Sequence, residues 1–177
     1  KVVEEAPSPV VTPDLRKKMG EAAVRLARAG GYVNAGTFEF LVDVSGRGAQ
    51  SFVFIEANAR LQVEHTVTEA VTGLDLVEWQ LRVAAGERLP LAQHEVRLTG
   101  HAIEARVCAE DPSRGFLPSA GRLALLEWPQ MESVRVDAGF GTADTLPDSY
   151  DSLLGKAIAW AGTREQAAAR LAAALTH

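Results

Sequence analysis

The chain has 177 residues, of which 47% are hydrophobic and 23% are charged, a composition typical of globular proteins. Its net charge of -5 excludes the basic surface expected of a protein that binds nucleic acid or anionic membrane. The lone Cys108 excludes an internal disulfide and a Cys-rich zinc site, and no apolar run approaches the ~20 residues of a membrane span, so we expect a cytoplasmic protein.

A helix, a β-hairpin and a second helix are predicted in the first half of the chain. Thr12, Pro13 and Asp14 supply an N-cap, a first helical residue and a first-turn acid, and Gly30 and Gly31 end that helix. The two hairpin strands, the glycine-containing turn between them and the second helix are expected at residues 37–44, 51–58, 45–50 and 74–85.

After a linker at residues 87–93 the pattern becomes rich in β-strand signals. Strands are expected at residues 99–110, 121–128, 134–138 and 153–161. An Ala-rich helix, residues 164–175, follows Thr163 as its N-cap. A helix and hairpin followed by a second sheet predict an α+β fold, and the linker places the domain boundary between residues 1–92 and 93–177.

A row of polar residues continues from the second hairpin strand at every second position. If the backbone stays extended, these side chains all face one side: Glu56, Asn58, Arg60, Gln62 and Glu64. The opposite parity carries Ile55, Ala57, Leu61 and Val63, which suits a buried face. Glu64 would then lie about 20 Å from Asn58, so the chain must bend, and we expect the bend at residues 65–68.

Two carboxylates are expected to meet across the hairpin. Glu39 lies on the first strand, and pairing with Glu56 would bring two like charges to within about 5 Å of each other. A divalent cation between them would remove that repulsion, and Mg²⁺ prefers such oxygens. The alternative is two unrelated exposed acids.

Arg60, Glu64 and Arg106 are the other candidates for chemistry. A guanidinium can hold a small planar anion through two parallel hydrogen bonds, and a neighbouring carboxylate can take a proton from that anion. The alternative for Arg60 and Glu64 is an exposed ion pair. Arg106 shares a strand face with Glu104, and by itself this pattern is more typical of a structural charge pair.

The run from Glu56 to Glu69, EANARLQVEHTVTE, resembles the signature of biotin carboxylases, which are ATP-grasp enzymes that carboxylate biotin using ATP and bicarbonate. Segments that agree with it in family order lie at residues 1–7, 36–40, 100–106, 109–112, 116–119 and 150–152. The resemblance covers essentially the whole chain. Carbamoyl-phosphate synthases share the Glu-x-Asn-x-Arg opening but, as a family, not the Gln-Val-Glu-His continuation.

The resemblance implies a fold and a reaction. Residues 1–92 would be the second lobe of an ATP-grasp domain, and residues 93–177 the β-rich biotin carboxylase C-terminal domain, truncated at its end. The parent would be a ligase, a biotin carboxylase subunit or domain of a carboxylase such as acetyl-CoA carboxylase of fatty acid biosynthesis. Its implied partners are ATP, bicarbonate, a biotin carboxyl carrier protein or domain and a carboxyltransferase, with a homodimer left open.

The resemblance also implies roles for individual residues. Mg²⁺ or Mn²⁺ would be held with ATP by Glu39, Glu56 and Asn58, and Leu41 and Ile55 would flank the adenine. Bicarbonate would be bound by Lys1, Arg60, Gln62 and the Val63 backbone, with Glu64 as general base. Arg106 would stabilise the biotin anion. Plain hairpin core is the alternative for Leu41 and Ile55.

We expect this chain to be a fragment, because Lys1 is no initiator Met and the last helix ends at His177 without a Gly or Asn cap. In the resembled family the glycine-rich ATP lid precedes the position of Lys1, so the fragment alone is expected to be inactive. Two alternatives remain open: a non-catalytic folding or dimerisation module that keeps the family residues, and another ATP-grasp ligase such as a carbamoyl-phosphate synthase relative.

Overall fold

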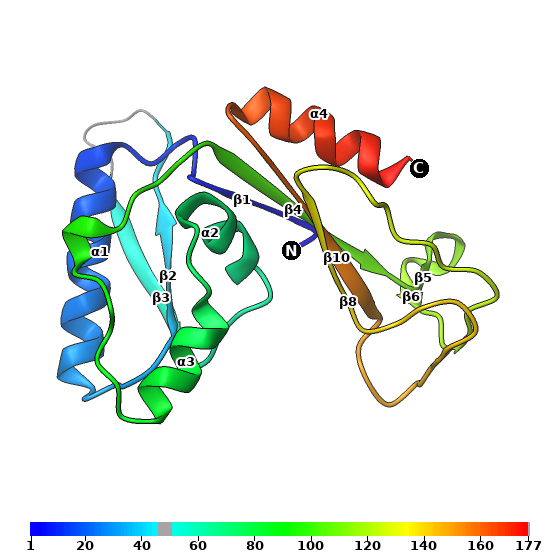
Figure 1. The fold of residues 1–177 in the computed structure, drawn as a ribbon, viewed down its shortest axis with the longest axis horizontal. Helices are drawn as coiled ribbons and strands as arrows, with labels where there is room; N and C mark the ends of the chain where they lie inside the picture. The colour runs from blue at the N-terminus through cyan, green and yellow to red at the C-terminus, as the bar shows by residue number, and fades with distance from the viewer. Residues whose placement is uncertain (46–50, 177) are drawn as a thin grey trace.

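A four-stranded antiparallel sheet organises the molecule, in the order β1-β4-β10-β8 (Figure 1). The computed structural model describes residues 1–45 and 51–176. The sheet strands are β1 (Val3–Ala6), β4 (His101–Cys108), β8 (Val134–Ala138) and β10 (Leu153–Ala161). Because β1 lies near the N-terminus and pairs with β4, the sheet unites two distant parts of the sequence.

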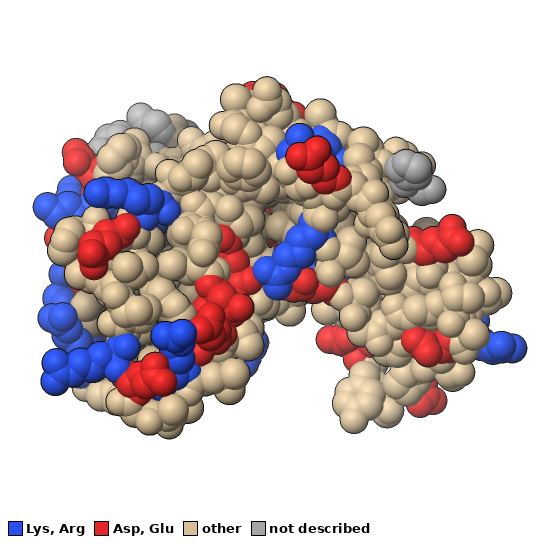
Figure 2. Space-filling model, viewed as in Figure 1, with Lys and Arg blue, Asp and Glu red and all other residues tan. Residues whose placement is uncertain are grey.

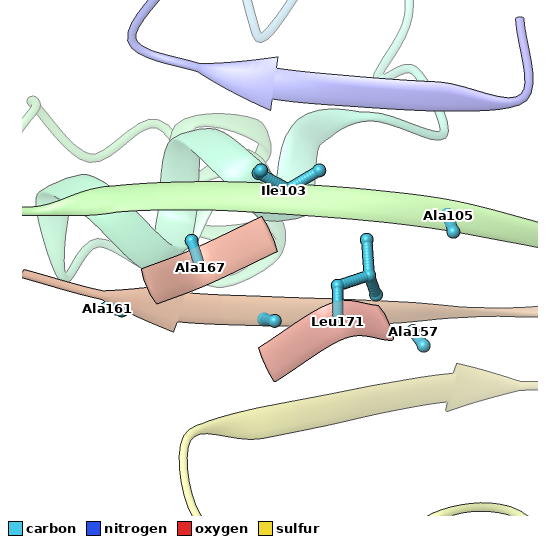
Figure 3. Close-up of a cluster of buried hydrophobic side chains, with 7 residues drawn as sticks. Ile103, Ala105, Ala157, Ala161, Ala167 and Leu171 are labelled. Atoms are coloured by element: carbon cyan, nitrogen blue, oxygen red, sulfur yellow. The ribbon is translucent and has the colours of Figure 1, made fainter. Parts of the chain in front are cut away.

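Helix α4 (Arg164–Leu175) covers one face of this sheet, as Figure 3 shows. Alternate residues of β4 and β10 point to that face and pack with the helix; the buried cluster is Ile103, Ala105, Ala157, Ala159, Ala161, Ala167 and Leu171. Most of these side chains are alanines, and their small size lets α4 lie close to the strands. Thr163 caps the helix by accepting a hydrogen bond from the Gln166 backbone N–H, as predicted.

Helix α2 (His65–Thr72) covers the opposite face of the sheet. Val67 and Val71 pack there against Ala102 of β4 and Ile158 of β10. The remaining elements of the first half are α1 (Pro13–Ala29), β2 (Thr37–Val42), β3 (Phe52–Asn58) and α3 (Leu76–Ala84). Short elements complete the second half: η1 (Gln93–Glu95), β5 (Glu110–Asp111), η2 (Pro112–Arg114), β6 (Leu117–Pro118), β7 (Gly121–Arg122) and β9 (Thr145–Leu146). The α+β prediction is confirmed.

The hairpin β2–β3 has the predicted pairing, in which Glu39 lies opposite Glu56. Helix α1 begins after Thr12, whose hydroxyl accepts from the Leu15 backbone N–H, and ends before Gly30, as predicted. The predicted hairpin turn lies, apart from Ser45, outside the described residues. Between α1 and the hairpin strand β2 lies a cavity of about 960 Å³.

The extended row predicted beyond the hairpin is wrong after Asn58. Strand β3 ends at that residue, residues 59–64 form a turn-containing connection, and α2 begins at His65. The bend was expected at residues 65–68, but the chain turns earlier, within residues 59–64. Packing of one helical face on the sheet explains the difference, because Val67 and Val71 are 5% and 2% exposed and stand at helical spacing.

Three smaller predictions also need correction. The helix expected at residues 74–85 begins at Leu76, because the Asp75 side chain caps it by accepting from the Glu78 backbone N–H. The strand expected at residues 121–128 is reduced to β7. Ile55 and Ala57 were expected on a buried face but are exposed in this chain. Among the described residues, no helix is long and apolar enough to cross a membrane.

Candidate functional site

Four charged side chains share the sheet face that α2 covers. Glu4 of β1 lies opposite Glu104 of β4, and Arg106 of β4 lies opposite Lys156 of β10. Glu104 is 0% exposed and Lys156 is 6% exposed. Charges of both signs occur in equal number, so each buried ion can find a partner, as burial of charge requires.

The hairpin end carries the second part of the site. The Asn58 amide donates to Glu39 Oε1 at 3.2 Å and to Glu56 Oε1 at 3.0 Å, so it bridges the two carboxylates. Gln62 Nε2 donates to Glu39 Oε1 at 2.8 Å. The Gln62 bond is the main reason that the pKa of Glu39 lies below its ordinary value; burial opposes this effect and the charge of Lys1 adds to it.

Glu64 joins the two parts. Its Oε1 accepts from Lys1 Nζ at 2.7 Å, and its Oε2 accepts from Arg106 Nη2 at 3.1 Å. The same Arg106 nitrogen donates to Glu4 Oε1 at 2.5 Å. Burial raises the pKa of Glu64, but the Lys1 hydrogen bond and the charges of Lys1 and Arg106 outweigh it, so the net pKa is lowered. The carboxylate is therefore ionised at neutral pH.

A cavity of about 1080 Å³ opens in front of these groups. Its polar wall includes Lys1, Glu39, Arg60, Gln62 and Glu64, and its apolar wall comes largely from α3 and the segments next to it. Figure 2 shows acidic side chains gathered near the middle of this face of the molecule, with basic side chains beside them. A cavity of this size, with a few convergent polar groups, is typical of a small-molecule site.

Some candidate residues lie differently from the prediction. Arg60 makes no ion pair with Glu64: its Nη1 donates to the Leu61 carbonyl oxygen at 3.2 Å, and its other nitrogens have no ion-pair partner among the described residues. The alternative of an exposed Arg60–Glu64 pair is therefore wrong. Leu41 and Ile55 are 63% and 48% exposed, so neither is a core residue of the hairpin in this chain.

The strand pattern taken alone favoured a structural charge pair of Arg106 with Glu104, and this pairing is not formed. Arg106 bonds Glu4 and Glu64, whereas Glu104 accepts from Thr66 Oγ1 and lies 3.5 Å from Lys156 Nζ. Sequence reasoning missed Glu4, Thr66 and the buried Lys156 as parts of this network. The available signal was the alternation of side chains along a strand. A Lys flanked by apolar residues on a central strand must have a partner on its own face of the sheet.

Comparison with known proteins identifies the chain's relatives. Residues 1–92 match the family described as "Carbamoyl-phosphate synthase L chain, ATP binding domain", and residues 104–177 match "Biotin carboxylase C-terminal domain". The biotin carboxylase of Nostoc sp. is 50% identical over 175 residues, which are 99% of this chain and 38% of that protein. The chain belongs to the biotin carboxylase family. The α subunit of mitochondrial methylcrotonoyl-CoA carboxylase from Mus musculus is also 50% identical, over 97% of this chain and 23% of that protein.

Solved structures agree with the biotin carboxylase assignment. The biotin carboxylase domain dimer of Hydrogenobacter thermophilus 2-oxoglutarate carboxylase, in complex with MgADP, ADP and bicarbonate, superimposes with a TM-score of 0.93 at 44% identity. This match covers 99% of the present chain and 38% of that one. The present chain thus spans well under half the length of these relatives. Their names include mitochondrial and chloroplastic forms, so a cytoplasmic location stays a prediction.

Proposed function

We propose that residues 1–177 belong to an enzyme that uses ATP and bicarbonate to carboxylate biotin on a carrier protein. The observation that carries this proposal is the convergence on Glu64 of Lys1 and Arg106, next to the Glu39–Glu56 pair. A carboxylate base, cationic groups and a carboxylate pair are the groups that this reaction needs. The similarity to a domain solved with MgADP and bicarbonate supports it.

The hairpin end fits a divalent cation that accompanies ATP. Glu39 and Glu56 present two carboxylates from neighbouring strands, and Asn58 adds an amide that already contacts both. Mg²⁺ is usually held by one or two carboxylates together with phosphate oxygens and water, and Mn²⁺ accepts the same oxygens. The ion would offset the charge of the ATP phosphates. The exposed side chains of Leu41 and Ile55, on the same hairpin, would flank the adenine.

Bicarbonate would bind at the connection between β3 and α2. Arg60, Gln62, the Val63 backbone and Lys1 would hold the anion, with Arg60 turning from the Leu61 carbonyl to grip it. Glu64 would accept the bicarbonate proton while a bicarbonate oxygen attacks the γ-phosphorus of ATP, with ADP as the leaving group. The product is carboxyphosphate, a mixed anhydride.

Biotin carboxylation would complete the reaction beside the sheet. The ureido N–H proton of biotin passes to a phosphate oxygen. The resulting biotin anion bonds the carboxyl carbon of carboxyphosphate through its nitrogen, and the bond from that carbon to the phosphate oxygen breaks to release phosphate. The ureido oxygen carries the negative charge of that anion, and Arg106 is an always-charged donor that can stabilise it.

We place the domain division after Ala92, and we assign the carrier protein, the carboxyltransferase and a homodimer as partners of the full-length protein.

The test is an assay of phosphate release from ATP by the protein that the full open reading frame containing this chain encodes. We expect release to require bicarbonate and to be stimulated by biotin. Bicarbonate-dependent release that responds to ammonia and not to biotin would favour a carbamoyl-phosphate synthase relative. Absence of any bicarbonate-dependent release would favour a non-catalytic module and would overturn the proposal.

A further inference from the structure

We propose that Lys156 is a positioning residue that sets the geometry of the bicarbonate-binding connection, residues 59–64, by binding the Val63 carbonyl oxygen. The contact joins β10, at the centre of the sheet, to the residue immediately before the predicted base Glu64. The inference rests on the proposed function, because it assigns a role to Lys156 within the same reaction.

The ammonium group of Lys156 is buried between Glu104 and the connection. Its side chain is 8% exposed, and its Nζ donates to the Val63 carbonyl oxygen and lies 3.5 Å from Glu104 Oε2. Glu104 is 0% exposed, and it also accepts from Thr66 Oγ1 in α2. A buried ammonium group is expected only where partners satisfy it, and here the partners are one anion and one carbonyl of the connection.

The bond to Val63 determines more than the position of one oxygen. The Val63 carbonyl and the Glu64 N–H belong to the same planar peptide group, so holding the carbonyl also orients the backbone from which the Glu64 side chain leaves. The carbonyls on either side are bound within the connection and α2: Gln62 accepts from His65 N–H at 3.2 Å, and Glu64 accepts from Val67 N–H at 3.3 Å. Lys156 therefore adds an anchor from the sheet to a segment otherwise held by local bonds.

Glu104 is the anionic partner of Lys156, and its observed hydrogen bond goes to Thr66 in α2. Burial raises the pKa of Glu104, and the Thr66 hydrogen bond and the charge of Lys156 oppose that rise. Replacing Lys156 alone would leave this buried carboxylate without its cation, and such a variant could fail to fold. The informative variant is Lys156→Met with Glu104→Gln, because it removes both charges and the donor to Val63 while nearly keeping side-chain volume.

Two single variants serve as comparisons. Glu104→Gln alone removes the anionic partner but retains the Lys156 amine that donates to the Val63 carbonyl oxygen, so its difference from the double variant isolates the effect of that bond. Lys18→Met makes the same chemical change at an exposed position of α1, away from the site. Each variant is made in the full open reading frame, and kcat and the KM values for bicarbonate and ATP are measured. Amide hydrogen exchange at His65 and Val67 is followed against exchange in α4.

For the double variant we expect the bicarbonate KM to rise about tenfold and kcat to fall on the order of 10²-fold, because a small misplacement of a reacting group commonly costs that much. The ATP KM should stay near the parent value. Protection should be lost at His65 and Val67 but kept in α4. Lys18→Met should retain the parent bicarbonate KM and the parent protection pattern, and Glu104→Gln should raise the bicarbonate KM less than the double variant does.

Three results would overturn the inference: an unchanged bicarbonate KM in the double variant, an equal rise of both KM values, or parent-like protection at His65 and Val67. An equal rise would indicate general loosening of the fold. If the parent itself shows no bicarbonate-dependent turnover, the proposed function fails. The exchange measurement then decides separately whether Lys156 orders the connection.

Discussion

Replacing Glu64 by Gln gives the sharpest test of the site, because one carboxylate is hydrogen-bonded to both Lys1 and Arg106. The amide keeps the size of the side chain and one acceptor oxygen but removes the negative charge. The single remaining oxygen can accept from only one of the two cations, through an ordinary bond, and the other cation then faces the amide nitrogen, which cannot accept. At about 1 kcal/mol for each of the two bonds, the variant should lose roughly 2 kcal/mol of folding stability. It should still fold, because the side chain is only part-buried, at 22% exposure.

The kinetic effect should exceed the effect on stability. Loss of a general base commonly costs about 10²–10⁴ in rate, so kcat should fall in that range while the bicarbonate KM changes little, since Arg60 and Gln62 remain. The assay is steady-state phosphate release across bicarbonate concentrations in the full-length protein. Glu21→Gln, the same change at an exposed position of α1, is the matched control.

The pH profile supplies a second readout for Glu64. The lowered pKa of Glu64 means that the carboxylate stays ionised through neutral pH. Its contribution to stability is therefore present above the unfolded pKa of about 4.3 and is lost as the pH falls through the still lower folded value. The stability difference between parent and Glu64→Gln should accordingly shrink in acid. A Glu64→Gln kcat that matches the Glu21→Gln control would refute Glu64 as the base.

The other predictions concern bicarbonate binding, the carboxylate pair proposed to hold the metal, the biotin anion and the hydrophobic core. Arg60→Lys should raise the bicarbonate KM and lower kcat, because a single ammonium group cannot form two parallel bonds; a parent-like KM would contradict this. Glu39→Gln or Glu56→Gln should lower activity by about 10²-fold, most clearly at limiting Mg²⁺, and full activity there would exclude the metal role. Arg106→Gln should reduce biotin-stimulated release most and the biotin-independent reaction less, because Arg106 also bonds Glu64; equal losses measured with and without biotin would count against a biotin role. Leu171→Ala should cost about 2–5 kcal/mol in a denaturant titration, since Leu171 is 6% exposed, and a value near zero would contradict its packing against the sheet.

The sequence alone predicts the parts of the fold that are determined by local signals such as helix caps. The ends of α1 and α4 follow from Thr12, Gly30 and Thr163, whose side chains or backbones act within one helical turn. The pairing of Glu39 with Glu56 follows from the two hairpin strands. These features need only neighbouring residues, so a reading of the sequence can find them.

The beginning of α2 shows why the polar row was misread. Alternation of polar and apolar residues from Glu56 to Glu64 is a strand signal, whereas Val67 and Val71 repeat at helical spacing. The helix forms because burying those two valines on Ala102 and Ile158 stabilises it through tertiary contacts. That outcome depends on β4 and β10, which lie far away in the sequence.

The partners of the charged groups could not be predicted from the sequence, because they too depend on the pairing of strands that lie far apart in the chain. Glu4 reaches Arg106 only because β1 pairs with β4. Lys1 lies two residues before the start of β1, so this pairing also places Lys1 beside Glu64. The sheet that carries Arg106 thus takes in a strand from the first residues of the chain. A cation from the start of the chain and a guanidinium from the central sheet then meet on one carboxylate. Their positions relative to Glu64 consequently depend on the same strand pairing, and a change that weakens β1 should disturb bicarbonate and biotin chemistry together.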